Sequence, residues 1–164
     1  MPSTYEPIAT TTLGSAAGTI TFSSIASSWT DLRIVFATAG QSASSTTQLR
    51  FNNNSTTIYS RTTLIGDGAS ATSGRTTSGT NITLGNALDS TKPSLLTADV
   101  FSYAGSTNKT VLANINNDRN GTGFVSNLVG LYASTTAISR VDLICNGGTY
   151  NTGTTATLYG IKNA

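Results

Sequence analysis

Apolar and polar side chains alternate with a period of two along much of this chain. The alternation is clear over residues 19–22, 32–37, 48–51, 96–101, 140–143 and 157–160. Because successive side chains of a β-strand point to opposite faces, each stretch is predicted to be a strand with one face on a core. The residues expected to face inward are Ile34, Phe36, Leu49, Phe51, Val100, Leu112, Leu131, Val141, Leu143 and Leu158.

Turn signals separate these stretches, and the clearest of them is Asn120-Gly121. A type I′ hairpin turn needs positive φ at both central residues, which Asn and Gly tolerate. This turn is predicted to join a strand near residues 110–116 to one near 124–133. Turn signals recur along the chain with no convincing amphipathic helix, which predicts an all-β fold of roughly ten short strands. We expect residues 1–164 to form one antiparallel β-sandwich or jelly roll.

The segment 1–13 permits two interpretations. Pro2 and Pro7 disfavour a central strand and suit an extended arm or a sheet edge. The threonines at 10–12 could pair with a neighbouring protein, or residues 8–13 could form the first strand of the domain itself. The sequence does not decide between these two alternatives.

The polar residues of this chain are mostly serine and threonine, and few are charged. Serine and threonine number 21 and 31, about a third of the residues, whereas charged residues are 10% and the formal net charge is +2. Because the net charge is so weak, we expect neither a nucleic acid nor a membrane surface as a partner. No apolar run approaches the roughly 20 residues that span a bilayer, and the opening residues do not predict a secretory signal.

The chemistry of the side chains argues against an enzyme. The absence of histidine excludes Ser-His-Asp and Cys-His mechanisms. Seven acids remain, of which any two could meet in space, but most occupy predicted turns or strand ends, where Asp bonds its own backbone. We therefore predict no catalytic residue, no cofactor and no metal site. Residues 116–121 lack the terminal Glu of a calcium loop and contain Arg119, so they are interpreted as a hairpin.

Two further side chains have alternative roles. Trp29, at the entry to a predicted strand, could stack on a sugar ring or pack at a loop-to-strand corner, and the second is preferred. Cys145 ends an apolar run and is expected to be a small buried side chain rather than a reactive thiol.

Several blocks of the chain resemble small virion proteins of tailed bacteriophages, many of them marine or cyanobacterial phages. The blocks are YEPIATTTL (5–13), ITFSSI (20–25), WTDLRIV (29–35), LRFN (49–52), YS (59–60), GDG (66–68), STTAISRV (134–141) and GTTATLYGI (153–161). They span most of the chain and contain no catalytic motif. The resemblance implies a structural protein located in the virion and supplies no active-site residues.

Taken together, the residues and the resemblance predict a capsid decoration (cement) protein that binds the major capsid protein and copies of itself, with three copies favoured by the resemblance. Tyr5, Pro7, Ile8 and Trp29 are the predicted partner-binding residues. The alternative is a tail- or fibre-associated protein that binds host surface glycan. A third possibility is a carbohydrate-binding module of a cellular enzyme.

Overall fold

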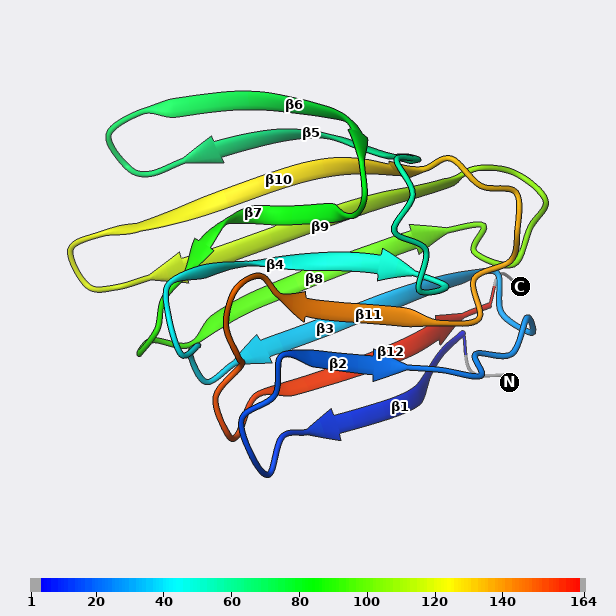
Figure 1. Ribbon diagram of the computed structural model, residues 1–164, viewed down its shortest axis with the longest axis horizontal. Helices are drawn as coiled ribbons and strands as arrows, with labels where there is room; N and C mark the ends of the chain where they lie inside the picture. The colour runs from blue at the N-terminus through cyan, green and yellow to red at the C-terminus, as the bar shows by residue number, and fades with distance from the viewer. Residues whose placement is uncertain (1–3, 163–164) are drawn as a thin grey trace.

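The computed structural model describes residues 4–162 and contains twelve antiparallel strands in two packed sheets (Figure 1). The strands are β1 (Tyr5–Thr12), β2 (Thr19–Phe22), β3 (Asp31–Thr38), β4 (Ser45–Phe51), β5 (Tyr59–Gly66), β6 (Ala71–Gly79), β7 (Ile82–Leu88), β8 (Ser94–Phe101), β9 (Lys109–Asp118), β10 (Gly123–Tyr132), β11 (Val141–Cys145) and β12 (Thr155–Ile161). The predicted all-β sandwich is confirmed, with two more strands than the rough count. No helix among the described residues could cross a membrane.

The two sheets differ in width. The large sheet has eight strands in the order β1-β12-β3-β8-β9-β10-β5-β6, and the small sheet has four in the order β2-β11-β4-β7. Figure 1 shows the small sheet in front of the large one, with β10, β5 and β6 extending beyond β7. A sheet of four strands therefore covers only part of the inner face of its partner.

The strand pairs are nested. β1 pairs with β12, β2 with β11, β3 with β8 and β4 with β7. Two hairpins interrupt this series: β5–β6 lies between β4 and β7 in the chain, and β9–β10 lies between β8 and β11. Both hairpins join the large sheet, which is why it has twice as many strands as the small one.

The core lies between the sheets and is continuous from β1 to β5 across the large sheet. An aromatic cluster fills its β5–β10 end, where the ring centroids of Tyr59 and Tyr132 lie 4.9 Å apart and those of Phe51 and Tyr132 lie 5.4 Å apart. Ile82 of β7 packs directly on the backbone of Gly130 in β10, because a Cβ at that glycine would lie 2.8 Å from the isoleucine Cδ1. This close approach brings the edge of the small sheet onto the inserted β9–β10 hairpin.

Two arginines attach the inserted hairpins to β7. Arg61 of β5 donates a hydrogen bond to the carbonyl of Thr83, and Arg119 of the β9–β10 turn donates to the carbonyl of Ala87 at 3.0 Å. Arg119 also forms an ion pair of 3.3 Å with Asp89. Both arginines donate to carbonyl groups of β7, which lies at an edge of the small sheet and pairs only with β4 among the described residues.

Most of the predicted core positions are buried, but two are not. Leu112 is 46% exposed and Leu131 is only half-buried. The inward face of β9 carries Val111, Ala113 and Ile115 instead. The side-chain period of two makes this a one-residue error in register, which places every side chain of a strand on the opposite face.

Two predictions about loops and edges are settled by the pairing. The Asn120-Gly121 turn is confirmed, since the two residues have φ of 56° and 118° and Arg119 N–H donates to the Thr122 carbonyl at 2.8 Å. The N-terminal segment is an edge strand, because β1 pairs with β12 over its length with a bulge at Ile8. The part of the predicted arm before Thr4 lies outside the described residues.

The observed core predicts which truncations are costly. Phe36→Ala and Leu143→Ala remove side chains with no exposed surface, so each should reduce the free energy of unfolding by about 2–5 kcal/mol. Leu112→Ala, the matched control on the outer face of β9, should change it by less than about 1 kcal/mol. Urea titration checks this, and a loss at Leu112 as large as at Leu143 would reverse the assigned faces.

Stability should fall at alkaline pH. Burial raises the pKa of Tyr59 from 10.0 to about 12, and its hydroxyl donates to the Asn54 carbonyl at 2.9 Å. Because the unfolded chain loses this proton at lower pH than the folded one, the stability present below pH 10 is lost as pH rises towards 12, by up to about 1.4 kcal/mol per pH unit. Tyr59→Phe should show a shallower decline in chemical denaturation at pH 10–12; an identical slope in both proteins would contradict this assignment.

Candidate interaction surface

Most of the carboxylates are engaged in turns and ion pairs. Asp67 accepts backbone N–H bonds from Ala69 and Ser70, and Asp89 accepts them from Thr91 and Lys92. These bonds lower the pKa of both aspartates and keep them ionised. Within residues 4–162, no group of three or more His, Cys, Asp or Glu side chains is placed to hold a metal ion.

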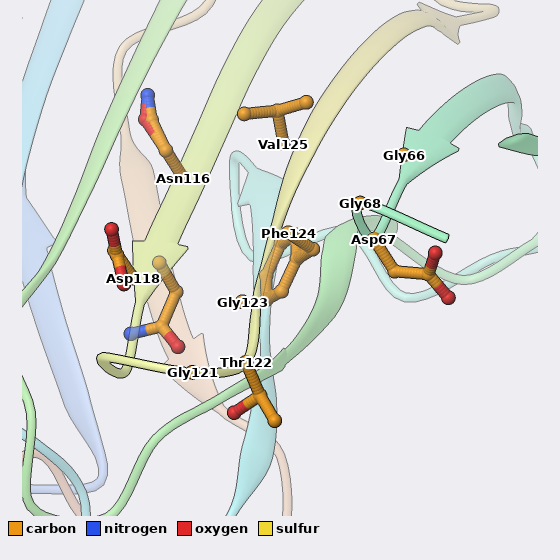
Figure 2. A pocket seen from close by; sticks show the side chains of 11 residues that line it. Gly66, Asp67, Gly68, Asn116, Asp118, Gly121, Thr122, Gly123, Phe124 and Val125 are labelled. Carbon is orange, nitrogen blue, oxygen red and sulfur yellow. The ribbon is translucent and has the colours of Figure 1, made fainter. Parts of the chain in front are cut away.

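A hollow of about 460 Å³ lies between the β5–β6 turn and the tip of the β9–β10 hairpin. Figure 2 shows Phe124 at its centre, with Asp118 on one side and Asp67 on the other, its carboxylate pointing away. Asp118 accepts the N–H of Asn120 at 2.8 Å, as the hairpin interpretation of this segment requires. The hollow is therefore formed by two turns and offers no facing pair of carboxylates.

Cys145 is buried, as predicted for a small side chain of the core. Its thiol lies 3.3 Å from the hydroxyl of Ser45, and burial raises its pKa. A buried thiol with a raised pKa is a poor nucleophile.

The outer face of the large sheet carries every large apolar side chain that is exposed among the described residues. These side chains are between 39% and 61% exposed and comprise Tyr5, Leu64, Leu95, Phe101, Leu112, Val125 and Val129. All of them lie on strands of the eight-stranded sheet and alternate with inward-facing residues. We refer to this surface as the apolar face. Scattered exposed apolar residues are normal, whereas their confinement to one face indicates an interaction surface.

Strand register places the central members of the apolar face side by side. Leu112 of β9 is opposite Val129 of β10, and Asn127 of β10 is opposite Leu64 of β5. Together with Asn114 they border a groove of about 380 Å³ that crosses the three strands. The polar members of this groove are uncharged amides and hydroxyls.

An ion pair borders the groove on the side of β3. Arg33 binds Asp99 through two parallel hydrogen bonds of 2.6 and 2.7 Å, and Asp99 is opposite Leu112 in the register. The hydrogen bonding that Arg33 donates to the Asp99 carboxylate is the largest cause of the raised pKa of Arg33. Both charges are thus neutralised within the face, so neither stands unpaired against a docked partner.

The outer face of the small sheet is polar by comparison. Asp142 lies at its centre and accepts hydrogen bonds from Thr21 at 2.7 Å and from Arg140 at 2.9 Å. Gln48 and Arg50 project from the neighbouring strand β4 on the same side. The sandwich consequently has one polar outer face, on the small sheet, and one outer face with exposed apolar side chains, on the large sheet.

The four predicted partner-binding residues are divided by the structure. Tyr5 belongs to the apolar face, where its ring stacks on Tyr159 at a centroid distance of 4.5 Å, and Pro7 is exposed on the same edge strand. Ile8 and Trp29 instead pack against the core. The Trp29 indole covers the backbone of Gly160, where a Cβ would lie 2.3 Å from the ring, so this side chain fills a corner of the sandwich.

The central residues of the apolar face were missed by the sequence analysis. In β9 the sequence does distinguish the two faces. Val111, Ala113 and Ile115 form an uninterrupted apolar series on one face, whereas Leu112 shares the other face with Asn114 and a second asparagine. The prediction places Leu112 inward because of its size, although the other residues on its face of the strand are polar. In β10 apolar residues occupy both series, so alternation does not choose between the two faces.

The packing of Trp29 predicts a structural effect and no sugar response. Trp29→Ala should reduce the free energy of unfolding by about 1–3 kcal/mol, less than for a fully buried indole because this one is half-buried. As the single tryptophan, it should emit at the short wavelengths of a shielded indole, and added oligosaccharides should leave the emission unchanged. A sugar-dependent shift would restore the glycan-stacking role.

Comparisons with known proteins do not assign the chain to a family. No known protein family matches it, and no curated protein is found to be related to it.

Proposed function

We propose that this chain is a structural protein of a bacteriophage virion, a decoration protein that binds the shell of major capsid protein through its apolar face. One observation carries the proposal: all the exposed large apolar side chains of the described residues share the outer face of one sheet. The resemblance of several sequence blocks to small phage virion proteins supplies the class of partner.

The size of the apolar face suits a stable protein interface. Strands about 4.8 Å apart and residues rising about 3.3 Å give the outer face of eight strands of eight residues an area of roughly 1,000 Å². A standard protein interface buries about 800 Å² on each partner. The centre of such an interface is depleted of charged residues, as the groove between β9, β10 and β5 is.

The fold is compatible with this role. We infer that the eight nested strands β1–β4, β7, β8, β11 and β12 form a jelly roll, an arrangement of eight strands in two sheets that viral capsid domains use. The hairpins β5–β6 and β9–β10 are insertions that widen one sheet of it. These insertions contribute Leu64, Leu112 and Val129 to the apolar face.

The binding test uses particles that lack this protein. A Leu112→Glu/Val129→Glu double variant should bind them about 10- to 100-fold more weakly than the unmodified chain, since apolar anchors at the centre of an interface contribute about 1.4–2.7 kcal/mol or more. Thr19→Glu/Gln48→Glu, the matched variant on the outer face of the small sheet, should bind normally. Equal binding by both double variants, each with an unchanged melting temperature, would overturn the role of the apolar face.

The location is tested separately. Antibody labelling of intact virions should mark the whole head. Labelling confined to the tail would overturn the decoration role in favour of the tail-associated, glycan-binding alternative.

A further inference from the structure

The two sheets have four edge strands, and three of them are protected against pairing with another chain. β1 carries Pro7, which lacks an N–H, and a bulge at Ile8. β2 is only four residues long. β7 is occupied by the two arginine side chains that donate to the carbonyls of Thr83 and Ala87. Prolines, bulges, short strands and covering groups are the features by which proteins prevent edge-to-edge association.

The fourth edge, β6, has no such feature over residues 71–77, and its one bulge lies near its end, beside Ser78. It is nine residues long with the sequence ATSGRTTSG, contains no proline, and carries one charge, Arg75. Its side chains are exposed on nearly the whole strand, because β6 extends past the small sheet (Figure 1). Within residues 4–162, β5 is the only strand that pairs with it. One side of β6 therefore presents unpaired backbone groups without steric obstruction.

We propose that β6 pairs with β6 of a second copy of this chain, antiparallel and across a two-fold axis, so that two large sheets become one continuous sheet. An identical strand is the occupant best matched to this edge. The contact is isologous, which means that the same strand of each copy forms one side of it. Threonine pairs of the kind that β1 and β12 already form, at 3.0 Å between Thr10 and Thr157, would line the junction.

The charge of Arg75 and the regular length of the strand together select the register. A two-fold axis at Arg75 would place two arginines directly opposite each other, and like charges in that position are destabilising. The strand is regular from Ala71 until Ser78, which has φ of 56° beside a bulge in the β5–β6 pairing. The midpoint of residues 71–77 is Gly74. An axis there pairs Thr72 with Thr76 of the second copy and moves the two arginines apart.

Gly74 makes this register testable without disturbing the fold. A Cβ at Gly74 would meet no atom within 4 Å, and the residue does not have positive φ. Residues opposite each other on antiparallel strands have Cα atoms about 4.5–5.5 Å apart, within the range that a disulfide spans. Gly14, which lies on a loop, provides the matched control. A Cβ there would also meet no atom within 4 Å, and its φ is not positive.

The experiment measures mass and cross-linking of the full chain. The unmodified protein should have twice the chain mass of 16.8 kDa in light scattering at micromolar concentration. Gly74→Cys should form an intermolecular disulfide dimer under mild oxidation while Gly14→Cys does not, and buried Cys145 should not cross-link. Gly74→Lys, which places like charges at the axis, should be monomeric, and Gly14→Lys should stay dimeric.

Three results would overturn the pairing. They are a monomer at micromolar concentration, the trimer that the resemblance implies, or a dimer that Gly74→Lys leaves intact. None of these results depends on particle binding, so the edge pairing and the decoration role can fail independently.

Discussion

The four-stranded sheet covers only part of the inner face of the eight-stranded sheet, and the other features of the structure follow from this difference in width. The inserted hairpins β5–β6 and β9–β10 both extend the large sheet, and neither adds a strand to the small one. Contact between the sheets is retained at the junction because Ile82 packs onto the bare backbone of Gly130. β5 still reaches β7 through Arg61, and β6 lies beyond the small sheet. The added strands of the large sheet supply the central apolar side chains of the outer face and an unprotected final edge.

The few charged side chains mostly serve the fold. Of the nine basic residues, Arg33 and Arg140 are paired with aspartates, Arg61 and Arg119 satisfy carbonyls of β7, and Lys109 is fully buried with its ammonium donating to backbone carbonyls. Exposed ion pairs contribute only about 0–1 kcal/mol each, so a partner gains little from such charges. Apolar contact, backbone pairing and hydrogen bonds of uncharged amides and hydroxyls are the main interactions that this surface offers a partner.

The sequence predicted the class of fold because alternation and turn chemistry are local. The Asn120-Gly121 hairpin and the buried face of β3 follow directly from residue types. The location of the apolar face does not, because it depends on which sheet is covered. β6, with serine, threonine and glycine on both faces, gives no alternation to detect, and its position at a sheet edge follows only from pairing with β5. Trp29 illustrates the converse, since a tryptophan that could bind a ligand instead fills the space above Gly160.

The proposed function requires that a partner covers the apolar face. Hydroxyl-radical footprinting of the protein, free and bound to virus particles, tests this most directly because it reports the exposure of individual side chains. The account predicts that oxidation of Leu64, Leu112 and Val125 falls on binding while Ile144, half-buried on the small sheet, is oxidised equally in both states. Protection of the small sheet with undiminished oxidation of these three side chains would contradict it.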